Sequence, residues 1–101
     1  MAQQDIESEW IHAQLATLDH DDMVSSLRHA LAFIESLTVD PEIADRNPPS
    51  RAALAWIRHI ERRFQTNIFA TRNDVLVRMR AELNDLEAAT ETWDVDEYLG
   101  K

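Results

Sequence analysis

Cysteine is absent from this 101-residue chain, glycine occurs only at Gly100, and there are three prolines. Without cysteine the protein forms no disulfide and carries no thiolate nucleophile. Tight β-hairpins need Gly, Asn or Asp at positive φ, so the near absence of glycine argues against a β-rich fold. It also excludes a glycine-rich phosphate-binding loop. Because β-branched alternation is missing too, the sequence predicts an all-α protein.

Long apolar runs and targeting signals are also missing. No apolar stretch approaches the roughly 20 residues that a membrane span requires, and residues 1–9 are polar and acidic, unlike a secretory signal. We therefore expect a cytoplasmic protein that does not bind membranes. A chain of this length has room for one core, so a single helical domain over residues 1–101 is predicted.

The main feature that is present is a long helical pattern. From Ala52 to Thr90 there is neither glycine nor proline, and apolar residues recur every three or four positions. This spacing predicts one amphipathic helix over about residues 50–90, roughly 55–60 Å long at 1.5 Å per residue. A short chain cannot wrap a compact core around such a rod. We therefore expect an elongated molecule.

Shorter helices are predicted on either side of the rod. Apolar spacing predicts helices over about residues 5–18 and 21–38, which the Asp-rich segment 19–22 either kinks or separates. Residues 39–49 contain all three prolines and read as a loop, after which Asn47 or Ser50 caps the next helix. A short acidic helix is expected at about 94–99. The predicted architecture is an elongated antiparallel helical hairpin or three-helix bundle.

Charge is segregated along the chain. Residues 1–50 carry ten acids and two arginines, residues 51–80 carry seven arginines and two acids, and residues 81–101 carry seven acids and one lysine. This pattern favours acidic helices that fold back beside a basic one, with modest and salt-sensitive stabilisation. The acidic flanks argue against nucleic-acid binding because they would repel phosphate.

Candidate chemistry is sparse. Glu9 and His12 match the Glu-x-x-His spacing of ferritin-like metal sites, which need two such pairs and further glutamates. The pair occurs once, so a metal protein that also uses Glu35 across an oligomer remains only an alternative. Ser25 and Ser26 lie near His29 but lack the third member of a triad and a glycine-rich elbow. We therefore expect no enzyme activity and no cofactor.

The apolar stripe supplies a candidate binding site. If the rod and the second helix pair only in part, they leave a groove for a partner helix. The last residues add an apolar cluster on an acidic tail, which needs something to dock against and is interpreted as a gate. The predicted groove residues are Ile57, Ile60, Phe64, Ile68, Val75, Met79, Leu27, Leu31 and Ile34, and the predicted gate residues are Trp93, Val95, Tyr98 and Leu99.

This layout from Leu15 to Leu99 resembles the FliT-type flagellar export chaperones. The resemblance rests on the break Leu18-Asp19-His20-Asp21-Asp22-Met23, on the Arg- and Glu-rich stretch from Ile57 to Leu86, and on the aromatic tail from Trp93 to Leu99. The chain departs from the family at the break, where His20-Asp21 stands in place of a Trp-Asp pair.

The resemblance implies a non-enzymatic chaperone that binds the helical C-terminal segment of a flagellar cap protein. It also implies delivery of that segment to the type III export ATPase apparatus, with the last helix covering the groove. The residue pattern leaves one further alternative open, an obligate helical homodimer with a structural or regulatory role, in which the stripe is buried against its own copy.

Overall fold

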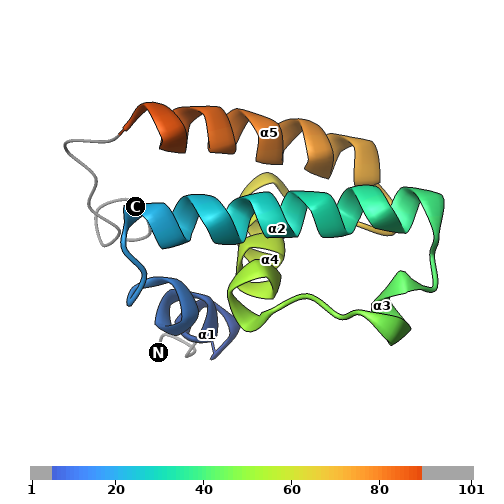
Figure 1. The fold of residues 1–101 in the computed structure, drawn as a ribbon, viewed down its shortest axis with the longest axis horizontal. Coiled ribbons are helices and arrows are strands. Elements are labelled where there is room, and N and C mark those ends of the chain that lie inside the picture. The colour runs from blue at the N-terminus through green and yellow to red at the C-terminus, as the bar shows by residue number, and fades with distance from the viewer. Residues whose placement is uncertain (1–5, 90–101) are drawn as a thin grey trace, which may run out of the picture.

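The computed structural model describes residues 6–89, which are helical with short connections (Figure 1). The helices are α1 (Ile6–Leu15), α2 (His20–Val39), α3 (Ile43–Arg46), α4 (Arg51–Phe64) and α5 (Arg72–Ala88). No strand occurs in this part of the chain. The prediction of an all-α fold is confirmed. The expected tail helix at 94–99 lies outside the described residues.

The helices pack in two directions. Helices α2 and α5 run antiparallel, side by side, while α4 crosses behind α2 and contacts both of them (Figure 1). Helix α1 packs against α4 on the side away from α5. Helix α4 is therefore central. Among its buried residues, Trp56 is fully enclosed by the surrounding helices.

Local sequence explains where α2 and α4 begin. Asp19 takes an extended conformation and its carboxylate accepts a hydrogen bond from Asp22 N at 2.8 Å, so it caps α2. Ser50 caps α4 in the same way through Ala53 N at 3.2 Å. The first two helices are thus separate, and Ser50 is the cap of the two predicted candidates. Helix α3 was not predicted and forms within the proline-containing loop.

The predicted rod over residues 50–90 is wrong. Helix α4 ends at Phe64 and α5 begins at Arg72, with a turn between them that sends α5 back along α2. The molecule consequently measures 38 × 36 × 23 Å and is not elongated. The physical reason is burial: folding the rod in half lets α4 and α5 both cover α2, whereas a straight rod covers it with one half only.

One apolar cluster holds the described residues together. It contains residues from all four long helices, including Leu15, Leu27, Ile34, Trp56, Ile60, Val75 and Met79. At about 25 cal/mol per Å² of apolar surface, burial of large side chains of this kind contributes about 1.5–3 kcal/mol each.

Candidate functional site

The predicted groove residues lie in the core. Seven of the nine are buried, and the other two, Leu31 and Phe64, are partly buried against the same cluster. The ring of Phe64 is further covered by Arg78, whose guanidinium carbon lies 4.7 Å from the ring centroid. The described residues therefore leave no open trough along this stripe. The apolar face was identified correctly, but it faces other helices of the same chain.

Two other predictions are the gate formed by the last residues of the chain and the metal site of the ferritin-like alternative. The gate residues Trp93, Val95, Tyr98 and Leu99 lie outside the described residues. Glu9 and His12 are exposed on α1, whereas Glu35 lies on α2 and pairs with Arg80 at 3.2 Å. Within residues 6–89 no group of three or more metal-ligating side chains comes together. The homodimer alternative stays a prediction, although the stripe that motivated it is buried within one chain.

Ion pairs link the helices, as the charge segregation predicted. Glu7 on α1 binds Arg58 at 2.6 Å and Arg62 at 3.5 Å on α4, and Arg63 binds Glu82 on α5 at 3.2 Å. The hydrogen bond from Arg58 lowers the pKa of Glu7 below its usual value. Because the three arginine side chains remain 42–47% exposed, each pair contributes at most about 1 kcal/mol.

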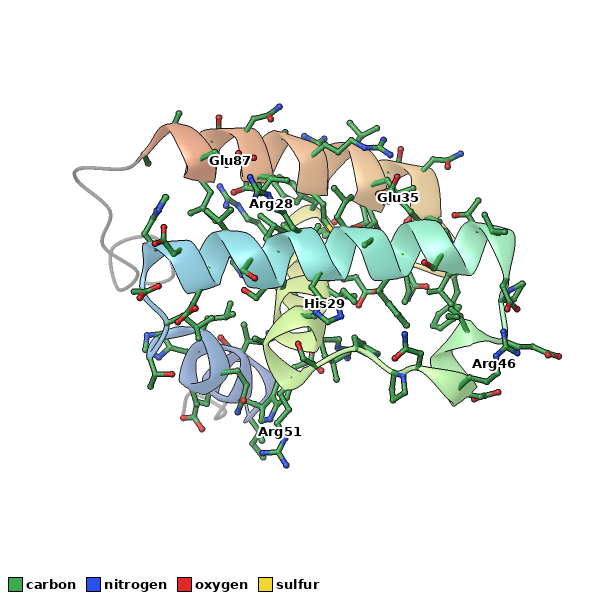
Figure 2. All side chains as sticks on the ribbon, in the orientation of Figure 1. Arg28, His29, Glu35, Arg46, Arg51 and Glu87 are labelled. Atoms are coloured by element: carbon green, nitrogen blue, oxygen red, sulfur yellow. The ribbon has the colours of Figure 1, made fainter. Side chains whose placement is uncertain are left out.

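The seam between α2 and α5 carries two further pairs. Arg28 binds Glu87 at 2.8 Å, and Glu35 binds Arg80 one heptad further along. Figure 2 shows Arg28 and Glu87 reaching toward each other across the two helices. Arg51 points outward from the start of α4, whereas Arg46 on α3 pairs with the nearby Asp40 and Glu42.

A polar cluster around Trp56 is structural. The indole N–H donates to Ser26 Oγ at 2.9 Å, and that hydroxyl donates to the carbonyl of Met23 at 3.0 Å. His59 packs edge-on against the indole at 5.7 Å, and burial lowers the pKa of its imidazole to about 4, with Arg63 adding to the effect. Ser26 thus uses its hydroxyl to hold Trp56. His29 is exposed (Figure 2).

The turn between α4 and α5 is unusual because side chains satisfy much of its backbone. Asn67 Oδ1 accepts hydrogen bonds from Phe69 N at 2.8 Å and from Ala70 N at 3.2 Å. Thr71 Oγ1 accepts from Asn67 N at 2.7 Å and lies 3.2 Å from Asn67 O, to which it donates. These bonds form a compact Asx-type turn that needs no glycine.

Buried and cross-helix contacts anchor this turn. Glu61 is only 9% exposed, and its Oε2 accepts a hydrogen bond from Ile68 N at 2.9 Å while Ile68 itself is buried. Arg72 donates from Nε to Ile68 O at 2.8 Å and from Nη1 to Leu37 O of α2 at 3.4 Å. The turn is therefore fixed to both α4 and α2.

The anchored turn presents an exposed aromatic side chain. Phe69 is 78% exposed, although its neighbour Ile68 is buried. Beside it lies a hollow of about 430 Å³ lined by Thr38, Phe69, Ala70, Thr71, Arg72, Asn73 and Asp74. We call these seven residues the Phe69 surface.

Further apolar side chains lie at the same end of the molecule. Val39 follows Glu35 by one turn on α2, and Val77 precedes Arg80 by one turn on α5. Because Glu35 and Arg80 are paired, both valines lie beyond that pair, toward the turn. They are 87% and 62% exposed. This end therefore gathers three of the five large apolar side chains that are exposed among the described residues.

Sequence reasoning did not single out Phe69. It placed Phe69 inside a continuous helix, and the only warning was the polar Thr71 that interrupts the apolar stripe. Asn67 lies four residues before Thr71, and the Thr71 hydroxyl bonds to the Asn67 backbone, so this spacing is the local signal for the turn.

A second hollow lies at the other end of the α2–α5 seam. It measures about 420 Å³ and is lined by His20, Asp21, Val24, Ser25, Arg28 and Glu87. His20, from the Asp-rich break quoted for the family resemblance, donates from Nε2 to Leu86 O at 2.6 Å. It thus satisfies a carbonyl in the last turn of α5 and ties the start of α2 to the end of α5.

Comparisons with protein-family models, with curated proteins and with solved structures found no match for this chain. Over residues 6–89, no helix combines the length and the apolar character needed to cross a bilayer. The likeness to the FliT-type export chaperones therefore rests on the sequence features quoted for it.

Proposed function

We propose that this chain is a non-catalytic helical adaptor of the chaperone type, which binds a helical segment of a partner protein at the Phe69 surface. The observation that carries the proposal is the exposure of Phe69 on a turn that hydrogen bonds anchor to α4 and α2. The proposed partner surface is therefore the end of the bundle that carries Phe69, and not the predicted groove, whose residues lie in the core.

The physical argument is that an exposed aromatic is costly to leave in water and useful in an interface. Phe, Tyr and Trp are enriched at the centres of protein interfaces, and exposed apolar clusters mark such sites. The hydrogen bonds that order the turn in the free monomer add to this, because less ordering is needed when a partner binds. The hollow beside Phe69 is lined mainly by polar residues, which provide a polar rim for the contact.

The family resemblance suggests which partner protein this surface binds. It suggests the C-terminal helical segment of a flagellar cap protein, a cytoplasmic setting and delivery to the export ATPase. In this proposal the apolar face of that segment packs on Phe69 and on the neighbouring valines, Val39 and Val77, in the manner of helix recognition by an apolar surface.

Isothermal titration with a synthetic peptide tests the narrow proposal. The peptide is the C-terminal segment of the flagellar cap protein from the same organism. We expect Phe69→Ala to weaken binding at least about tenfold, because an aromatic anchor is lost. Ile6→Ala is the matched control, since Ile6 is also a large apolar side chain, 73% exposed, on α1. Equal affinities for both variants would contradict the Phe69 surface, and no binding by wild type would remove the flagellar partner.

Site-specific photo-crosslinking tests the wider proposal. A photoreactive phenylalanine is placed at position 69 or, as control, at position 6, and the full chain is expressed in its native host. We expect position 69 to form one reproducible adduct that position 6 does not form. Adduct patterns that are the same for the two positions would overturn the assignment of Phe69 as the anchor.

A further inference from the structure

The break between α4 and α5 interrupts a segment whose sequence favours one helix. Residues 52–90 contain neither glycine nor proline, and the apolar spacing passes through the turn by way of Phe64 and Ile68 to Val75. No residue of the turn prevents helix formation in the way that proline does. Tertiary contacts of Glu61 and Arg72, together with the local bonds of Asn67 and Thr71, therefore maintain the turn.

Two features of the turn are unfavourable. Gln65 has a left-handed conformation, with φ 52° and ψ 48°, a region that glycine adopts much more readily. The next residue, Thr66, has a buried hydroxyl that makes no hydrogen bond within the described part of the protein. Both penalties disappear if residues 65–71 become helical, because Gln65 then takes a right-handed conformation and Thr66 moves out of its buried position.

Helix α5 is held by contacts that a second copy can also provide. Its apolar face lies mainly on α2, flanked by the Arg28–Glu87 and Glu35–Arg80 pairs. Its covalent link to the rest of the fold, on the N-terminal side, is the 65–71 turn. If α5 leaves its own α2 and packs on the α2 of another copy, the same ion pairs and the same apolar contacts form between chains.

We propose that residues 65–71 act as a hinge, that α4 and α5 join into one helix over Arg51–Ala88, and that two copies of the chain exchange α5. Such a helix is roughly 57 Å long. The turn loses its side-chain hydrogen bonds and gains those of the helix backbone. This inference does not depend on the proposed function, although the exchanged dimer removes the turn that presents Phe69.

Cross-linking between chains tests the exchange directly, because the chain has no cysteine of its own. Glu35→Cys and Arg80→Cys are made as separate variants, mixed in equal amounts in urea, refolded at high concentration and treated with a short bismaleimide. We expect a covalent product that contains both variants, because residue 35 of one chain faces residue 80 of the other. Each variant refolded alone and the native proteins mixed without urea are the controls. Absence of the mixed product, or equal yields in the controls, would overturn the exchange.

A matched pair of substitutions at Gln65 tests the hinge. Gln65→Gly suits the left-handed turn and weakens a helix, whereas Gln65→Ala does the reverse. Size-exclusion chromatography with light scattering measures the dimer fraction after refolding, and circular dichroism confirms that each variant is folded. We expect the dimer dissociation constants to differ by about tenfold or more, with Gln65→Ala the tighter dimer. Equal constants, or the opposite order, would contradict the hinge.

Discussion

The junction between α1 and α2 and the junction between α4 and α5 both redirect the chain without a glycine, but different contacts hold them. At the first, Asp19 supplies a carboxylate to Asp22 N and a carbonyl to Met23 N, so its bonds reach three or four residues along the chain. At the second, the buried Glu61 bonds to Ile68, seven residues away, and Arg72 reaches Leu37 on another helix.

The difference shows two ways to redirect the chain between helices. An N-cap such as Asp19 does not depend on the rest of the fold, because its hydrogen-bond partners are close to it in the sequence. The second junction depends on the rest of the fold, since Glu61 and Ile68 are buried only when α5 has returned along α2. The hydrogen bonds at Asn67 then shape the turn, but contacts with other helices determine that the chain turns here. Substitutions at the two junctions should therefore change the unfolding free energy by different amounts.

The largest effect is expected at Glu61. Glu61→Ala leaves the buried Ile68 N–H without its acceptor and removes one of the two acidic partners of Arg58, which should cost about 2–3 kcal/mol of unfolding free energy. Glu61→Gln keeps an acceptor for Ile68 N and should lose clearly less. Urea denaturation followed by circular dichroism measures both variants. Similar losses for Ala and Gln would show that the carboxylate acts through charge and not through this hydrogen bond.

Much of the first junction and of the core was predictable because the signals are local. Asp19 and Ser50 are strong capping residues at the correct positions, and the apolar spacing identified residues that are buried, such as Ile60 and Val75. Charge segregation predicted that the basic segment pairs with acidic neighbours, as Arg58 and Glu7 do. Each of these inferences uses residues whose role follows from their own neighbourhood.

The second junction and the candidate site were not predictable from such signals. Residues 65–71 contain neither glycine nor proline, and weak helix formers such as Thr66 and Asn67 also occur inside helices, so propensity alone does not place a break here. A periodic apolar face also does not reveal what will cover it. Ile57 and Met79 were read as lining a groove, although they face other helices of the same bundle. The exposure of Phe69 follows from the turn, and so it was missed with the turn.

A smaller effect is expected at the first junction. Asp19→Ala removes the cap of α2 and should lower the unfolding free energy by about 1 kcal/mol. Asp19→Asn is the control, because an amide oxygen also accepts from Asp22 N. The same urea titration compares the two, and a loss for Asn as large as for Ala would mean that charge at the start of α2, not capping geometry, stabilises this junction.

The smallest effect, and the only gain in stability, is expected at Thr66. Its hydroxyl is buried without a hydrogen-bond partner among the described residues, and Thr66→Val replaces it with a methyl group of similar shape. Removing an unsatisfied polar atom in this way should raise the unfolding free energy of the monomer, in which α5 packs on its own α2, by about 0.5–1 kcal/mol. Thermal unfolding at low protein concentration measures the monomer, and Thr66→Ser, which keeps the hydroxyl, is the control. Because valine and threonine share β-branching, the backbone preference of the turn is unchanged. A loss of stability in Thr66→Val would therefore mean that the hydroxyl has a hydrogen-bond partner in the folded protein. The turn between α4 and α5 would then carry no free-energy penalty from an unsatisfied hydroxyl.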